Sequence, residues 1–400
     1  MPRRHWSRST LAQALLAFSF NIIGLFAGSL LNIYTPLFKT ALWILILFPP
    51  ILTVRGDISG ILSGNLSTML HTGQVGPRIR GNTRPFYSLV SGIFVLTFID
   101  TLGMGVLSLT MNLISGRVSP DQFYIFAVVP TTACTMTVIL AIPLTSLIAF
   151  SCFKRGLNPD ILVYPILSSL NDILVTISYV ITVSLILNSG LHYIPGIIFL
   201  FVMLFSLYLI WRNRGVELFV LTLREGVPLV LLSSLFGTYN GTMLATIAER
   251  FLSYPGLIIL YPALMSTLGD IGSTIGSLTT TRLALGYLRT FKEVIRESLN
   301  KVLHIEVAAA FIHIVFGFIT YLIVVSESLY VSLPFLIGVA LLSNLTSFLI
   351  ASLLSSIIAY SAFKRGWNPD NFVIPFITSV SDTVATLSLL PATAILRIIG

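Results

Sequence analysis

Two aspartates, Asp172 and Asp382, stand inside long apolar segments of this sequence. Each lies twelve residues after an Asn-Pro-Asp sequence that favours a helix start, so it is about 18 Å into a membrane helix and close to the bilayer midplane. An ionised side chain at that depth usually faces an internal cavity or an ion path. Ser168 and Thr378 precede the aspartates by four residues and therefore share their helical face. These four side chains predict an oxygen-rich site for a hard cation such as Mg²⁺.

Two further acids, Asp57 and Asp270, lie in segments rich in Gly, Ser and Thr that follow Pro50 and Pro262. A Gly-Asp pair after a proline predicts a broken helix, whose free carbonyls and aspartate line a water-filled path. Two plainer interpretations stay open. The small residues can serve close helix packing, and a membrane aspartate can pair with Arg55.

The composition indicates that these acids lie in a membrane protein. Of 400 residues, 55% are hydrophobic and 10% are charged, against about 25% charged in soluble domains. Apolar windows of about 20 residues, the length that spans a bilayer, follow one another almost without interruption. The net charge of +8 is scattered over short loops, so no nucleic-acid surface is expected. Cys134 and Cys152 share one apolar segment and predict neither a disulfide framework nor a zinc site.

We expect an all-α polytopic membrane protein with about eleven spans. The predicted spans are 11–33, 37–72, 85–116, 120–153, 160–188, 192–211, 219–247, 251–285, 302–326, 330–363 and 371–397. With the amino terminus in the cytoplasm, most of the 23 Lys and Arg residues fall on the cytoplasmic side. The carboxyl terminus is then expected outside the cell membrane.

The sequence also contains an internal repeat with a period of 210 to 213 residues. Residues 153–160 read Phe-Lys-Arg-Gly-Leu-Asn-Pro-Asp and residues 363–370 read Phe-Lys-Arg-Gly-Trp-Asn-Pro-Asp. In each copy a proline follows five residues later, and Asp172 or Asp382 seven residues after that. Earlier in each copy, Pro50 with Gly56-Asp57 matches Pro262 with Gly269-Asp270.

Five spans per copy would turn a directly fused second copy upside down, but the unmatched span near 192–211 restores its direction. We therefore predict two parallel, pseudo-symmetric five-helix units, residues 1–190 and 215–400, joined by a linker helix within 191–214. Twofold symmetry about the membrane normal would then bring Asp172 and Asp382 together across one pathway. Asp160 and Asp370 are expected to be helix-start residues, and structural or peripheral roles are expected for Asp100, Glu306 and His313.

These motifs resemble the MgtE divalent cation transporters, in the tandem form of their eukaryotic solute-carrier relatives. The resemblance rests on the polar segment of the second span in each copy. It rests more specifically on the fifth span of each copy, where Asn-Pro-Asp is followed by Pro and then by Ser-x-x-Asp, from Asn158 to Asp172 and from Asn368 to Asp382. Bacterial members place an Asn ligand where this chain has Tyr164 and Ile374, and often an Asn where it has Asp57 and Asp270.

The resemblance implies five-helix units paired around a central pore, with the fifth-helix aspartate binding Mg²⁺. Here one chain is expected to supply both halves as a pseudo-dimer, and the large cytoplasmic regulatory domains of bacterial members are not expected. The transported ion is Mg²⁺, with Mn²⁺ and Co²⁺ as further candidates. No cofactor or enzymatic activity is implied, and the expected partners are divalent cations and membrane lipids.

Two other functions fit parts of the pattern. One is an exchanger that couples Na⁺ or H⁺ to divalent metal transport, with a titrating carboxylate. The other is an intramembrane aspartyl protease, but the sequences Val54-Arg55-Gly56-Asp57 and Thr267-Leu268-Gly269-Asp270 lack the Gly-x-Gly-Asp form expected of it.

Overall fold

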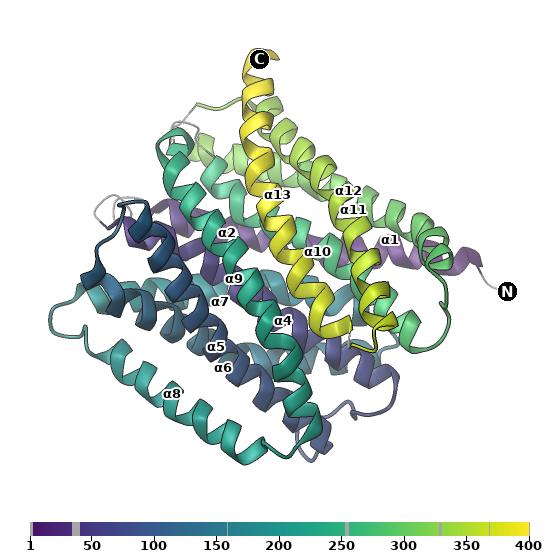
Figure 1. Cartoon of the computed structure of the whole chain (residues 1–400). Coiled ribbons are helices and arrows are strands. Elements are labelled where there is room, and N and C mark those ends of the chain that lie inside the picture. Colours follow the sequence, from purple (N-terminus) through teal and green to yellow (C-terminus); the bar gives the residue numbers. More distant parts are fainter. Residues whose placement is uncertain are drawn as a thin grey trace.

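The computed structural model describes residues 3–33, 41–157, 159–252, 256–327, 330–367 and 369–399, and they are almost entirely helical. The helices are α1 Arg3–Ser19, α2 Ile22–Ile33, α4 Leu42–His71, α5 Arg84–Ile114, α6 Phe123–Lys154, α7 Pro159–Leu187, α8 Ile194–Asn213, α9 Glu217–Leu252, α10 Leu257–Ala284, α11 Phe291–Ser326, α12 Leu333–Lys364 and α13 Pro369–Ile399. A short 3₁₀ turn, Pro120–Gln122, precedes α6. Figure 1 shows these helices gathered into one bundle.

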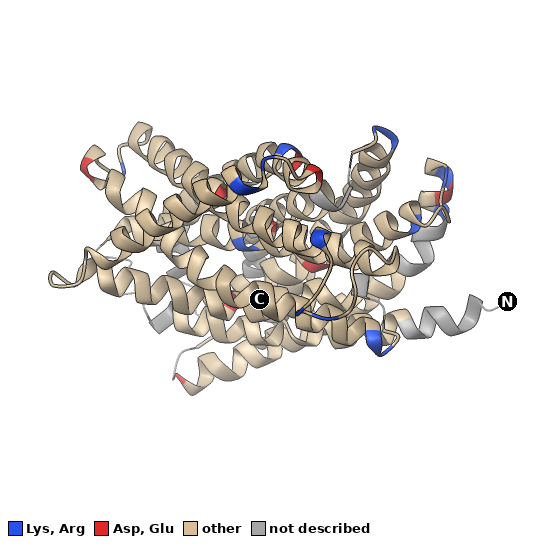
Figure 2. Cartoon of the chain, turned by 90° about the horizontal axis from the view of Figure 1, so that it is seen from below, with Lys and Arg blue, Asp and Glu red and all other residues tan. Residues whose placement is uncertain are grey.

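Eleven helical stretches of the described residues are long and apolar enough to cross a membrane, with α1 and α2 together supplying the first. Most of the Lys and Arg positions lie at helix ends and in loops (Figure 2). This distribution keeps charged groups near the bilayer surfaces. The predicted class, an all-α polytopic membrane protein of about eleven spans, is confirmed.

The repeated Lys-Arg-Gly sequence ends the fourth helix of each half. Gly156 and Gly366 adopt positive φ values of 67° and 70°, a conformation that favours glycine and ends α6 and α12. The amides of Leu157 and Trp367 then bond back to the carbonyls of residues 152 and 362, each at 3.0 Å. The following helices begin at prolines, which suit the first helical position. This turn fixes where α7 and α13 start, and therefore how deep their aspartates lie.

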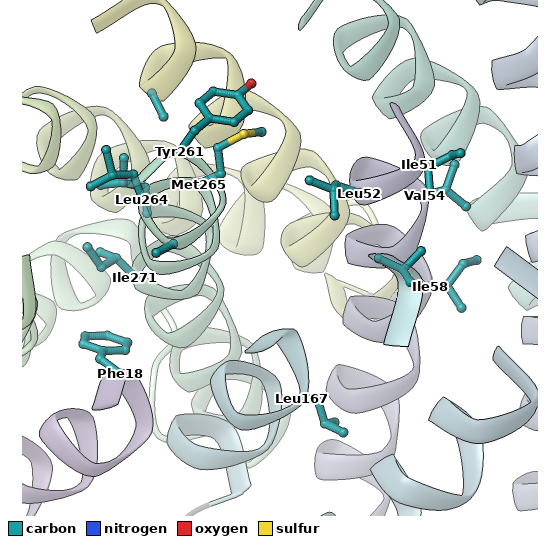
Figure 3. Packing of buried hydrophobic residues seen from close by; sticks show 14 of the residues in the cluster. Phe18, Ile51, Leu52, Val54, Ile58, Leu167, Tyr261, Leu264, Met265 and Ile271 are labelled. Carbon is teal, nitrogen blue, oxygen red and sulfur yellow. The ribbon is translucent and has the colours of Figure 1, made fainter. Parts of the chain in front are cut away.

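The helices α4 and α10 occupy the centre of the bundle, where 94% of each apolar window is buried. Figure 3 shows Ile51, Val54 and Ile58 of α4 and Leu264 and Ile271 of α10 in the apolar cluster around them. Both helices are continuous. The prediction that these segments are broken was therefore wrong.

The polar residues of these two segments maintain the helix instead of interrupting it. Hydroxyls of Ser63, Thr267, Ser273 and Thr279 bond to carbonyls one turn earlier in their own helix. The glycines allow close approach: a Cβ on Gly272 would lie 2.1 Å from Cγ2 of Ile377 on α13. Neighbouring helices thus pack against a helix that sequence propensity alone would break.

The break falls instead in the first span, at Phe20 and Asn21 between α1 and α2. Amides there bond to carbonyls three residues earlier, as from Asn21 to Phe18 at 3.0 Å. The corresponding first helix of the second half, α9, is continuous through this level. The two halves therefore differ in their first helix.

The first helix of each half packs on the other half. Helices α1 and α2 contact α10 and α11, whereas α9 contacts α4 and α5. Paired glycines make these contacts close: Cβ atoms on Gly28 and Gly241 would lie 2.3 and 2.2 Å from the carbonyl oxygens of Ile259 and Ile46. The fifth helices cross over too, since α7 contacts α10 and α13 contacts α4. In both halves, therefore, the first and fifth helices contact helices of the other half, so the two halves are interleaved.

The helix α8 lies at the margin of the bundle (Figure 1), against α5, α6 and α7. Only 17% of its apolar window is buried. Large apolar side chains such as Phe201 and Trp211 are each 65% exposed, as expected for a helix bathed in lipid. This position suits a helix that connects the halves without forming the centre.

We predict that Gly241→Val destabilises the bundle by about 1–3 kcal/mol, because the added side chain meets the α4 backbone at its point of closest approach. Thermal unfolding in detergent measures this. Gly215→Val is the matched control, since nothing lies within 4 Å of a Cβ at that position. Equal melting temperatures for the two variants would contradict the close α4–α9 contact.

Candidate functional site

The α7 aspartate, Asp172, lies between the two central helices. Arg55 of α4 forms an ion pair with it, and the same guanidinium donates a hydrogen bond to Oγ of Ser168 at 3.0 Å. The hydroxyl of Ser266, on α10, donates to the second carboxylate oxygen of Asp172. The side chains of Arg55 and Asp172 are 8% and 1% exposed. Pairing with Arg55, one of the two interpretations that the sequence left open, therefore holds for Asp172.

The α13 aspartate, Asp382, is close enough to Arg55, Asp172 and Asp270 for their charges to interact. Among the described residues, none makes a hydrogen bond or an ion pair with its carboxylate. Asp382 is 8% exposed, whereas Asp57 and Asp270 are fully buried. Of the four predicted acids, Asp382 is thus the most open.

The α10 acid, Asp270, is held by the break in the first span. The side-chain amide of Asn21 donates to Asp270 Oδ2 at 2.6 Å and reaches Thr267 Oγ1 at 2.9 Å. Ser169 of α7 donates to the carbonyl oxygen of the same amide. The break between α1 and α2 therefore places one amide where it serves an acid of the opposite half.

The α4 acid, Asp57, has no hydrogen bond to either carboxylate oxygen within the described part of the chain. It interacts electrostatically with Asp100 of α5, and Ser233 of α9 lies beside it. Asp100 accepts a hydrogen bond from Ser234 at 2.5 Å. Sequence reasoning assigned Asp100 a structural or peripheral role because no acid matches it in the other half. The one sequence feature that marks Asp100 as part of this cluster is that it lies inside an apolar span.

The two predicted hydroxyl ligands have different surroundings. Ser168 accepts the hydrogen bond from Arg55. Thr378 donates to the carbonyl of Pro375 at 2.9 Å, and its side chain lies near Gly56 and Gly269.

The remaining polar residues named from the sequence lie elsewhere. Glu306 accepts from Asn344 at 2.8 Å, and His313 bonds to the carbonyl of Ala309 at 2.7 Å. The side chains of Asp160 and Asp370 lie outside the described residues, although α7 and α13 do begin at the prolines before them.

The four predicted acids come from four helices, two in each half, and Arg55 is the basic side chain that interacts with them. No group of three or more His, Cys, Asp or Glu side chains among the described residues is close enough to form a direct metal cage. The acids instead interact through their charges, and Ser168 and Ser266 bond to Arg55 and Asp172. If ionised, the four acids outweigh one guanidinium by three charges, which favours binding of a cation.

In the described part of the chain, eleven apolar helical stretches with acids buried among them are typical of polytopic membrane proteins that move ions. The profile of the MgtE family, described as a divalent cation transporter, matches residues 48–182 and 261–392. These two stretches run from α4 to α7 and from α10 to α13. The chain belongs to the MgtE divalent cation transporter family, and it is a transporter and not an enzyme.

Several curated proteins are similar along nearly the whole chain. Solute carrier family 41 member 3 of Mus musculus is 24% identical over 420 residues, which are 96% of this chain and 82% of that protein. The Rattus norvegicus protein of the same name is 24% identical, over 94% of this chain and 85% of its own length. Solute carrier family 41 member 2 of Homo sapiens is 23% identical, over 94% of this chain and 68% of its own length. No solved structure matches the chain at a significant level.

We predict that Asn21→Ala lowers the free energy of unfolding by about 1–3 kcal/mol, because it leaves Asp270 without its amide donor. Thermal unfolding of the purified chain in detergent measures the loss. Ser19→Ala, which removes an exposed hydroxyl two residues away, is the control. A melting temperature equal to that of this control would mean that Asp270 does not depend on Asn21.

Proposed function

We propose that this chain moves Mg²⁺ across the membrane along a path between its two halves, with the ion held near the midplane by Asp382 and Asp172. The observation that carries the proposal is the gathering of Asp57, Asp172, Asp270 and Asp382 around Arg55 inside the bundle. Membership of a divalent cation transporter family supports a doubly charged cargo.

The geometry favours an ion that keeps part of its water. Mg²⁺ dehydrates reluctantly and usually binds through one or two carboxylates, with waters completing six oxygen ligands. A loose set of acids without a direct cage fits such an ion better than a fully stripped one. The hydroxyls of Ser168, Ser266 and Thr378 lie near enough to Asp172 or to the central glycines to hold those waters.

The two halves are proposed to be parallel units, residues 1–190 and 215–400, with the linker helix α8 between them in sequence. The recurrence of the same interhelical contacts in both halves supports this division. Because α4 and α13, and likewise α7 and α10, contact across the division, the path is proposed to form within one chain, which acts as a pseudo-dimer. Asp57 and Asp270 are proposed to line the route on either side of the midplane pair.

We expect Asp382→Asn to reduce Mg²⁺ uptake into proteoliposomes by about tenfold or more, because it removes the most open carboxylate at the proposed midplane site. A Mg²⁺-sensitive dye inside the liposomes reports the flux. The control is Asp121→Asn, which removes an exposed acid outside the bundle. Uptake by Asp382→Asn equal to that of the control would contradict the proposed site. Repeating the assay with imposed Na⁺ and pH gradients separates passive from coupled transport.

We also propose that the amino terminus is cytoplasmic and the carboxyl terminus outside, since this places most Lys and Arg residues inside. Both native cysteines are buried, so single introduced cysteines can be labelled selectively. We expect Gln74→Cys to react only after the cytoplasmic face is opened, and Ser189→Cys to react on intact cells. The reverse pattern with a membrane-impermeant maleimide would invert the topology.

A further inference from the structure

Arg55 is a fixed positive charge at the centre of the proposed cation path, and it is present in one half only. The matched segments Val54-Arg55-Gly56-Asp57 and Thr267-Leu268-Gly269-Asp270 place Leu268 at the corresponding position of α10. The Arg55 guanidinium is paired with Asp172 and bonded to Ser168. The half that contributes Asp382 has no such cation at the matched position.

The ion pair makes the two midplane aspartates unequal. Asp172 has a guanidinium on one oxygen and the Ser266 hydroxyl on the other, so its charge is offset and its coordinating atoms are occupied. Asp382 has no such partner among the described residues, and it is the more exposed of the two. A divalent cation that enters this site meets one available carboxylate and one that already carries a positive group.

We propose that Arg55 is a tethered counter-cation, which holds the Asp172 side of the site until a divalent ion displaces it. This inference rests on the proposed function of the same site. A guanidinium and a dication repel each other strongly in a low-dielectric interior, so both cannot sit on Asp172. Each transport event then includes an exchange, in which Arg55 leaves Asp172 as the ion arrives and returns as it departs.

A small pocket of about 10 Å³, room for about one water, lies beside Arg55 between α4, α5 and α6, and its lining residues include Ser59, Thr97 and Thr137. These hydroxyls have lone pairs that can accept from a guanidinium. Thr97 lies about one turn before Asp100 on α5, and Asp100 is itself close to Asp57. A displaced Arg55 would have to enlarge this pocket, whose lining offers it polar side chains beside apolar ones.

The exchange would make binding weak and release fast. An ion held by two free aspartates in a buried site would leave slowly, because its departure leaves two bare carboxylates behind. A returning guanidinium neutralises one of them at once. A purely structural ion pair makes a different prediction, since its loss lowers stability without raising affinity for the ion.

The test is Mg²⁺ binding by the full-length chain in detergent, measured by calorimetry. Arg55→Leu reproduces the residue of the other half, and it is expected to tighten Mg²⁺ binding by about tenfold or more. Arg55→Lys keeps the charge and is expected to stay within about threefold of the native chain. Leu268→Arg places a second cation beside the site and is expected to weaken binding by about tenfold or more. Mg²⁺ affinity of Arg55→Leu equal to or weaker than the native value overturns the inference.

Arg55→Leu leaves the buried Asp172 without a positive partner and so can impair folding. A second variant tests the inference in that case. Arg55→Leu with Asp172→Asn removes both charges together, so no unpaired charge remains. Because the double variant removes both the competing guanidinium and the carboxylate that it covers, the two effects are expected to offset each other, and Mg²⁺ binding is expected to stay within about threefold of the native chain. Binding about tenfold weaker would mean that the loss of Asp172 is not offset by the loss of a competing cation, and would overturn the inference.

The outcome also separates this inference from the proposed function. If Asp382→Asn abolishes Mg²⁺ flux but Arg55→Leu leaves the Mg²⁺ affinity unchanged, the proposed site is supported and the proposed role of Arg55 is rejected. If Asp382→Asn transports as well as its control, the proposed site itself is wrong, whatever Arg55→Leu does.

Discussion

The structure depends on how carboxylates are compensated inside a low-dielectric bundle. Asp172 is offset by Arg55, Asp270 receives an amide from Asn21, and Asp100 receives a hydroxyl from Ser234. Each donor comes from a different segment of the chain than the helix of the acid it serves. The acids therefore link neighbouring helices through hydrogen bonds and ion pairs. To satisfy them, the bundle must bring together segments that are far apart in the sequence. Among the described residues, Asp57 and Asp382 are left with the least compensation.

The exchange of first helices explains how the two halves stay together around such a charged centre. Helix α2 packs on α10, and α9 packs on α4, through glycines that allow backbone contact, while α1 packs on α11. A half separated from the other would lose the helix that covers its own central segment, and with it Asn21 or Ser234. Separation would expose the polar residues of α4 or α10 to lipid, which is unfavourable. The halves form one unit because neither encloses its acids alone.

The two halves share one fold but differ in chemistry at matched positions. Arg55 corresponds to Leu268, and at the same spacing Asp100 corresponds to His313 and Asn21 to Ser234. Four acids with one guanidinium cannot be arranged with true twofold symmetry, so the charge distribution across the proposed path is unequal. A symmetric homodimer would place an arginine on both sides or on neither. A single chain is free to place one, and this asymmetry is the basis of the proposed exchange at Asp172.

The sequence by itself determined the membrane class, the eleven spans and the repeat, because length and hydropathy follow directly from the bilayer thickness. It also identified the acids, since an ionisable residue in an apolar span stands out without knowledge of its neighbours. Only the tertiary structure decided that α4 and α10 are unbroken, that the first span breaks at Asn21, and that Arg55 pairs with Asp172 and not with Asp382. These features depend on contacts between residues more than 100 positions apart, which pattern and propensity along the chain do not encode.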